Sequence, residues 1–194
     1  MNSLNSNQNS IQQNNSTSPA PQTACVETYY AQPYSLDAQG FYFSDLEDYE
    51  AKAEALKDCY GNQVEEFEIQ FIDGSKELCD LFNACYVNQA NLGQFLAIVD
   101  EVPEHQYPSF YFLMEQGRDM EDALNNYDEV QVQSGNLEDA AQELFDEIYM
   151  HEVPKHLQQY IDYSAFANDC QCGGDLVEFE FGGDTYTCTN ANSL

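Results

Sequence analysis

One sign of charge dominates this sequence. It contains 35 Asp and Glu against 5 Lys and Arg, which gives a formal net charge of −30 at neutral pH. Like charges packed into one sphere repel one another, so we expect an extended fold rather than a single compact globule. The same excess argues against binding to DNA, RNA or an anionic membrane surface, because these ligands require clustered Lys and Arg. The partners of this chain should be basic.

The N-terminal segment differs in composition from the rest of the chain. Residues 1–24 contain no charged side chain and are dominated by Asn, Gln and Ser. Such a segment buries too little apolar surface to offset the entropy of ordering, so we predict a disordered tail over residues 1–24. All 35 acids therefore fall in the remaining 170 residues. The 12 Phe and 14 Tyr of the chain supply ample apolar surface for folded cores.

The sequence also predicts a cellular location. No run approaches the roughly 18–20 consecutive apolar residues of a membrane span, and the N-terminus lacks the basic and apolar regions of a signal peptide. The seven cysteines are odd in number and scattered, which fits reduced thiols better than a disulfide framework. We therefore expect a cytoplasmic protein.

Hydrophobic patterning predicts an α+β fold, an elongated chain of three small modules. We place an N-terminal module of antiparallel sheet plus helix at residues 25–74. A central bundle of short helices follows at residues 75–126, and a C-terminal α+β module with a β-hairpin occupies residues 127–194. Segregated modules laid end to end would relieve the repulsion between acids.

Period-two alternation defines the sheet of the first module. Phe67, Ile69 and Phe71 alternate with polar residues, which is typical of a half-buried antiparallel strand with an anionic outer face. In the central module, Asp119 is expected to cap a helix. The expected elements of the first module are strands at Val26–Tyr30 and Gly40–Ser44, a helix at Leu46–Tyr60 and a strand at Glu65–Ile72.

The C-terminal module is predicted to hold two helices and three strands. Gly182-Gly183 supplies the turn of the terminal hairpin, whose first strand alternates apolar residues with Glu178 and Glu180. The other expected elements are a strand at Asp128–Gln133, a helix at Asn136–Glu152 and a helix from Pro154 to about Asp169.

No motif for catalysis or cofactor binding stands out. His151 and His156 are spaced i+5 with Pro154 between them, whereas a zincin helix requires i+4. Cys170 and Cys172 lack a matching pair at zinc-finger spacing. No phosphate-binding loop, Ser nucleophile motif or EF-hand occurs, and paired carboxylates among 35 acids single out no hydrolase site. We predict no enzyme, no metal site and no cofactor.

The predicted helix Asn136–Glu152 is the most informative segment. Its apolar residues form one stripe, with Ile148 and His151 at the C-terminal end, and acids line the remainder. Asp139, Glu143 and Glu147 repeat at i+4, where like charges each cost a few tenths of a kcal/mol. No Lys or Arg lies between Arg118 and Lys155 to neutralise them. A functional role, rather than a contribution to folding stability, would explain why these acids are present.

Two explanations that involve no binding function compete with a functional explanation of the acidic helix face. A charged helix face is usually only solvated, but solvated faces normally mix Lys with Glu. Adaptation to high salt would also produce acids, although the aromatic content and the uncharged tail fit it less well. The functional explanation rests on geometry: thirty charges correspond to roughly 50 Å of duplex DNA, or about fifteen base pairs. An elongated chain would place carboxylates at phosphate-like spacing, imitating nucleic acid.

A family resemblance supports this interpretation. The segment Leu157–Phe166, with Tyr160-Ile161-Asp162-Tyr163 at its centre, follows Val153-Pro154 and precedes a β-hairpin. It resembles the C-terminal signature of the ArdA antirestriction family, and weaker similarity covers most of residues 25–190. The resemblance implies an elongated three-domain homodimer, joined through its C-terminal module, which mimics bent DNA. It further implies occupation of the DNA-binding groove of type I restriction–modification enzymes, and carriage on a mobile genetic element.

The candidate DNA-mimic surface consists of acids on predicted helices and strands. Its members are Glu47, Glu50, Glu54, Glu66, Glu68, Glu138, Asp139, Glu143, Asp146, Glu147, Asp162, Glu178 and Glu180. Two other functions stay open from the residues alone. One is an acidic inhibitor or binding module for another basic protein, such as a nucleoid protein or another defence system. The other is a divalent-metal protein built on clustered acids.

Overall fold

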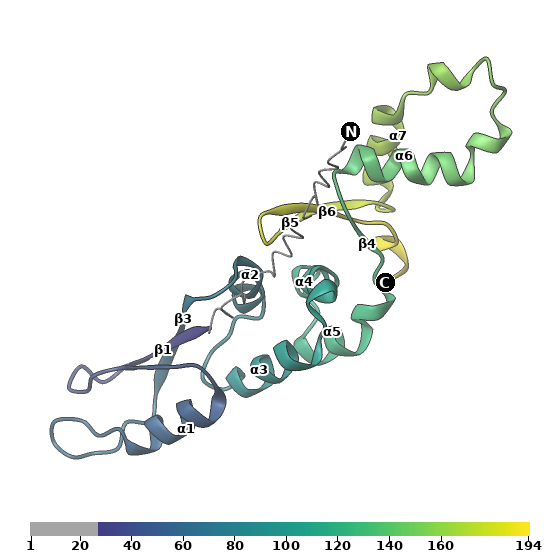
Figure 1. Ribbon diagram of the computed structural model, residues 1–194. Helices are drawn as coiled ribbons and strands as arrows, with labels where there is room; N and C mark the ends of the chain where they lie inside the picture. The colour runs from purple at the N-terminus through teal and green to yellow at the C-terminus, as the bar shows by residue number, and fades with distance from the viewer. Residues whose placement is uncertain (1–26) are drawn as a thin grey trace, which may run out of the picture.

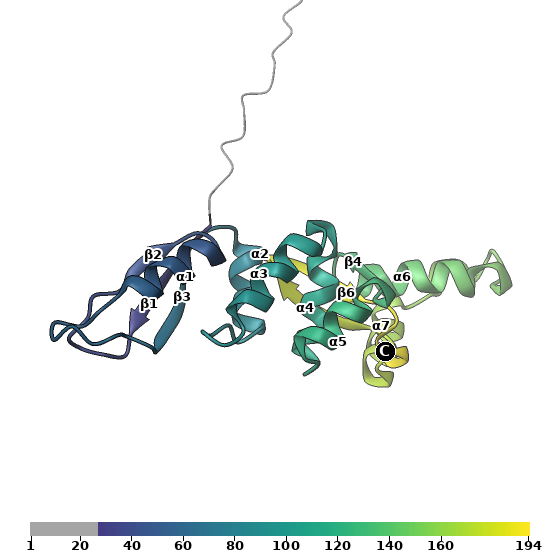
Figure 2. The ribbon, with the colours of Figure 1, turned by 90° about the horizontal axis from the view of Figure 1, so that it is seen from below.

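The computed structural model describes residues 27–194. The predicted tail at residues 1–24 lies outside the described residues. Figures 1 and 2 show an elongated body, with α1 (Leu46–Ala55) near one end and α6 (Leu137–Ile148) projecting at the other. The fold is mixed α+β with two three-stranded antiparallel sheets, so the predicted fold class is confirmed.

The first sheet has the strand order β2-β1-β3, and α1 covers one face of it. Alternation in β3 decides which face is buried: Phe67 and Ile69 are in the core, whereas Glu68 is exposed. Tyr49 from α1 packs its ring against Phe67 at 6.1 Å between centroids. The strands are β1 (Thr28–Pro33), β2 (Phe41–Phe43) and β3 (Phe67–Asp73).

The helix predicted to run to Tyr60 ends instead at Ala55. Leu56 has extended backbone angles, and the chain then enters a turn organised by Asp58. The Asp58 carboxylate accepts hydrogen bonds from the backbone N–H groups of Tyr60 and Asn62, at 2.9 and 2.8 Å. Asp side chains stabilise turns in this way and compete with the helix for the same backbone groups.

Short helices fill the middle of the body, as the pattern predicted. Ser75 caps α2 by accepting a hydrogen bond from Leu78 N–H at 3.1 Å, and Asp119 caps α5 through Asp122 N–H at 2.8 Å. The capping role expected of Asp119 is therefore confirmed. The helices are α2 (Lys76–Ala84), α3 (Leu92–Glu101), α4 (Tyr107–Glu115) and α5 (Met120–Asn126), with short turns η1 (Glu104–Gln106) and η2 (Tyr127–Glu129).

The second sheet has the order β4-β6-β5 and contains the predicted terminal hairpin. Gly182 and Gly183 form its turn with φ angles of +64° and +96°, a region that favours glycine. The strand expected to begin at Asp128 begins instead at Val132, because residues 127–129 form η2. The strands are β4 (Val132–Ser134), β5 (Val177–Phe181) and β6 (Asp184–Cys188), followed by the turn η5 (Ala191–Ser193).

The helices α6 and α7 form a hairpin that projects from this sheet (Figure 1). Asn136 caps α6, as expected, by accepting a hydrogen bond from Asp139 N–H at 3.0 Å. The second helix was placed wrongly, because α7 (Tyr163–Gly173) begins nine residues after Pro154. The start is set by Asp162, whose carboxylate accepts a hydrogen bond from Ala165 N–H at 2.9 Å. Residues between the helices form η3 (Met150–Glu152), η4 (Gln158–Tyr160) and loop.

Two clusters of buried side chains hold the described chain together. The larger runs from Tyr29 in the first sheet through the central helices to Phe181 and Cys188 in the hairpin. The smaller joins α6 to α7 through Ala140, Ala141, Ala167, Cys170 and Leu176. The predicted stripe on α6 is wrong at its end, since Ile148 and His151 are exposed. At its C-terminal end α6 extends beyond the sheet, and its Phe145 packs against Tyr163 and Phe166 of α7.

A hydrogen bond joins the first of the central helices to the terminal hairpin. The Asp80 carboxylate on α2 accepts from the backbone N–H of Gly182 in the hairpin turn, at 2.9 Å. Glu77, also on α2, lies so close that a Cβ on Gly182 would come within 2.8 Å of its side chain. The start of the central helices and the end of the chain are therefore fixed against each other.

Candidate acidic interaction surface

Every acid proposed from the sequence is exposed on the described chain. None of them takes part in an ion pair within residues 27–194, where the pairs are Lys52 with Asp48, Arg118 with Asp122, and His151 with Glu152. Their charge is therefore open to a partner. The structure distributes them over several surfaces at different points along the body.

At the N-terminal end the acids occupy two opposite faces. Glu47, Glu50 and Glu54 are spaced so that they share one side of α1. Glu68 lies on the sheet face turned away from the buried Phe67 and Ile69, and Glu66 precedes the strand in the same alternation. The sheet separates these two groups.

At the C-terminal end α6 carries the densest run of acids. Glu138 and Asp139 lie in its first turn, where the helix dipole favours negative charge. Glu143 and Glu147 lie further along, are exposed, and have no such compensation. The like-charge repeat expected from the sequence is therefore present on the surface of a real helix.

Some of the candidate acids also have internal hydrogen-bond partners that the sequence did not reveal. Asp146 accepts from the Tyr163 hydroxyl at 2.7 Å, and Glu178 accepts from Leu137 N–H at 2.7 Å. The hydrogen bond to Asp146 raises the pKa of Tyr163. Asp162 caps α7, so it too has a structural role. The hydrogen bonds of Asp146 and Glu178 join segments that are separate in sequence. Asp162 starts the helix whose first residue was predicted at the wrong position.

The structure also gathers acids that sequence reasoning missed. Glu27, Glu77, Asp100 and Glu104 line a cavity of about 800 Å³, bounded by α3, α4 and the hairpin. Burial, followed by the neighbouring Glu27 and other groups, raises the pKa of Tyr29 from 10.0 to about 12. No sequence signal identifies this cavity, because its acids come from four separate segments of the chain.

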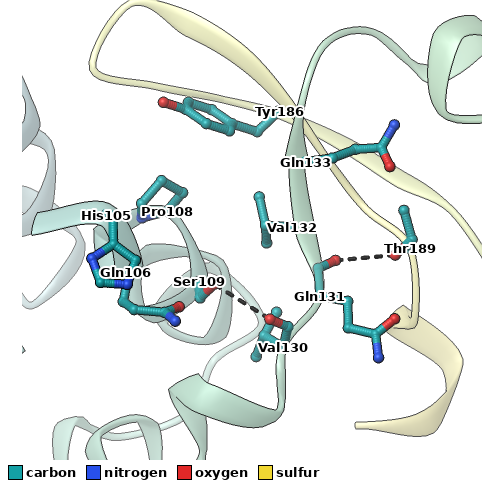
Figure 3. Close-up of a pocket in the computed structure, with 10 residues that line it drawn as sticks. All are labelled: His105, Gln106, Pro108, Ser109, Val130, Gln131, Val132, Gln133, Tyr186 and Thr189. Atoms are coloured by element: carbon teal, nitrogen blue, oxygen red, sulfur yellow. Dashed lines mark hydrogen bonds between the residues drawn. The ribbon is translucent and has the colours of Figure 1, made fainter. Parts of the chain in front are cut away.

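A second cavity of about 440 Å³ lies between α4 and β4 (Figure 3). Its lining contains no Asp, Glu, Lys or Arg and combines His105 and the amides of Gln106, Gln131 and Gln133 with apolar side chains such as Val130 and Val132. The Ser109 hydroxyl donates to the Val130 carbonyl oxygen at 3.4 Å and not to a general base. Neither cavity brings together a nucleophile, a base and an oxyanion donor.

The histidines and cysteines considered for metal binding are not gathered into one cluster in the described part of the chain. Within residues 27–194, no group of three or more His, Cys, Asp or Glu side chains could hold a metal ion. Cys172 is exposed, whereas Cys170 and Cys188 are buried, and burial is the main cause of the raised pKa of both buried thiols. No helix among the described residues is long and apolar enough to cross a bilayer.

Fold and surface together define a class: an elongated α+β protein whose two ends carry exposed carboxylates that form no ion pair within residues 27–194. Residues 35–184 match the antirestriction protein family ArdA, and the chain belongs to this family. The resemblance at Leu157–Phe166 is thereby confirmed. No curated protein matches the chain.

Family membership settles the general function. ArdA proteins are inhibitors without catalytic activity that mimic DNA and act on type I restriction–modification enzymes. The chain is accordingly an antirestriction protein, and its predicted target class is confirmed. The acid excess that argued against a nucleic-acid ligand is the property that such an inhibitor needs.

Proposed function

We propose that the candidate acids are the residues through which this chain occupies the DNA-binding groove of its target. The observation that carries the proposal is the acidic surface of α6, where Glu143 and Glu147 are exposed and form no ion pair with any residue of 27–194. Carboxylates there would take the positions of phosphates and bind Arg and Lys of the groove through charge-assisted hydrogen bonds. DNA is then excluded by occupation of its site.

The test compares two variants of equal charge. D139N/E143Q/E147Q neutralises three acids on α6, and E101Q/E115Q/E121Q neutralises three exposed acids outside the candidate set. Both are titrated against a type I restriction enzyme in competition with labelled DNA. We expect the α6 variant to lose at least tenfold more affinity than the matched variant. Equal losses would show that only net charge matters, and this would contradict the assignment.

A homodimer joined through the C-terminal module belongs to the same proposal. Ile148, Tyr149, Leu157 and Tyr160 are exposed on and beyond the end of α6, in the projecting hairpin. Large apolar groups gathered on a surface favour association with another protein surface. Sedimentation analysis should give a dimer for the wild-type chain and a monomer for Y149S/L157S. A wild-type monomer at micromolar concentration would refute the dimer.

We further propose the division into modules at residues 25–74, 75–126 and 127–194, and a cytoplasmic location, where the target enzyme meets DNA. The division is supported by the element order: a sheet with α1, then α2–α5, then a sheet with α6 and α7. Within residues 27–194, limited proteolysis should cut first near the two boundaries. Initial cleavage inside α3 or β6 would contradict them.

A further inference from the structure

Two adjacent loops at the end of the body opposite α6 expose large apolar side chains. The loops are residues 34–40, between β1 and β2, and residues 56–66, between α1 and β3 (Figure 1). Tyr34 is 66% exposed, Leu36 101% and Tyr60 76%. We call these three side chains the aromatic end. Large apolar side chains exposed on neighbouring loops favour a protein partner at that place.

The loops that carry the aromatic end are fixed by hydrogen bonds. Cys59 N–H donates to the Asp37 carbonyl oxygen at 3.0 Å, which ties one loop to the other. Tyr34 N–H donates to the Glu66 carbonyl oxygen at 3.1 Å. Asp58 holds the turn that carries Tyr60, and the hydrogen bond from the Asn62 side chain is the main cause of its lowered pKa. Preorganised side chains lose less entropy when a partner binds.

The charges around the aromatic end select the kind of partner. The exposed acids Asp37, Glu65 and Glu66 flank it, against Lys57 as the one basic residue in these two loops. An apolar partner would leave these carboxylates without partners. A surface that bears arginine side chains can contact both the carboxylates and the aromatic rings. Arginine stacks on aromatic faces while its N–H groups bind carboxylates. The partner surface should therefore present arginine side chains.

We propose that the aromatic end is a second contact with the restriction enzyme, made to arginine side chains at the edge of its DNA-binding groove. This inference rests on the proposed function and extends it from charge pairing to stacking. Carboxylate contacts weaken as salt screens them, with a Debye length of about 10 Å at 0.1 M and about 3 Å at 1 M. Stacking and apolar contacts persist in high salt, so the aromatic end would supply the salt-resistant part of the affinity.

The test measures affinity for a type I restriction enzyme from 0.05 to 1 M NaCl with three full-length variants. Y34S/L36S/Y60S removes the aromatic end, and D139N/E143Q/E147Q reduces the charge on α6. Y86N is the matched control, because Tyr86 is 83% exposed, lies outside these loops and has a φ of +48°, which Asn tolerates. Circular dichroism establishes that each variant is folded.

We expect Y34S/L36S/Y60S to lose about tenfold in affinity at every salt concentration, with an unchanged slope of log K against log salt; this is the size of two exposed cation–π contacts. D139N/E143Q/E147Q should instead reduce the slope, and Y86N should match the wild type. Wild-type affinity of the folded Y34S/L36S/Y60S variant in 1 M NaCl would overturn the inference. Absence of wild-type binding at any salt concentration would instead refute the proposed function on which it rests.

Discussion

Neutralising Glu143 should make the protein more stable while it weakens target binding. Glu143 lies one helical turn from both Asp139 and Glu147, about 6 Å along the axis at 1.5 Å rise per residue. Each like-charge pair at this spacing costs roughly 0.2–0.5 kcal/mol. Glutamine has nearly the same helix propensity as glutamate, so Glu143→Gln should stabilise the fold by about 0.4–1 kcal/mol. For a chain of this size that gain raises the Tm by about 1–4 °C.

Thermal unfolding followed by circular dichroism at 20 mM and 1 M NaCl measures this effect. The gain should be present at low salt and vanish at high salt, where charges one turn apart are screened. Asp146→Asn is the matched comparison, since Asp146 accepts a hydrogen bond from Tyr163 and should not stabilise when neutralised. A Glu143→Gln variant that is less stable than wild type at low salt, or whose gain persists in 1 M salt, would refute the argument that α6 carries uncompensated repulsion.

Three further substitutions test the packing. Tyr49→Phe should stabilise by about 1 kcal/mol in urea unfolding, because the buried Tyr49 hydroxyl has no hydrogen-bond partner among the described residues; destabilisation would indicate a partner. Asp162→Ala should cost about 0.5–2 kcal/mol by removing the cap of α7, and unchanged stability would contradict the observed helix start. Tyr29→Phe should reduce the alkaline loss of stability. The raised pKa of Tyr29 means that its contribution is complete below pH 10 and is lost as pH rises towards about 12, so equal alkaline unfolding curves for variant and wild type would count against it.

Local patterns predicted the elements whose causes are local. Alternation placed β3 and the terminal hairpin, and capping residues placed the starts of α5 and α6. The error at α7 arose because two helix-start signals compete: proline at a first helical position and aspartate as a cap. Pro154 is followed instead by a turn in which Leu157 N–H donates to the Pro154 carbonyl oxygen at 2.8 Å.

Tertiary features could not be predicted in this way. The exposure of Ile148 depends on how far α6 extends beyond the sheet that covers its first turns. The cavity lined by Glu27, Asp100 and Glu104 depends on the meeting of separate elements. The candidate acids were correctly expected to be exposed, but their division between opposite faces of the first sheet follows only from which face α1 covers.

The hydrogen bond between Asp80 and Gly182 bears on how the candidate acids are spaced along the body. It spans 102 positions of sequence and joins α2 to the final hairpin. This contact holds the central helices and the second sheet, which lie between α1 and α6, against each other. In the proposed complex, acids held at a fixed spacing by such a body would favour a groove whose cations repeat at the same interval.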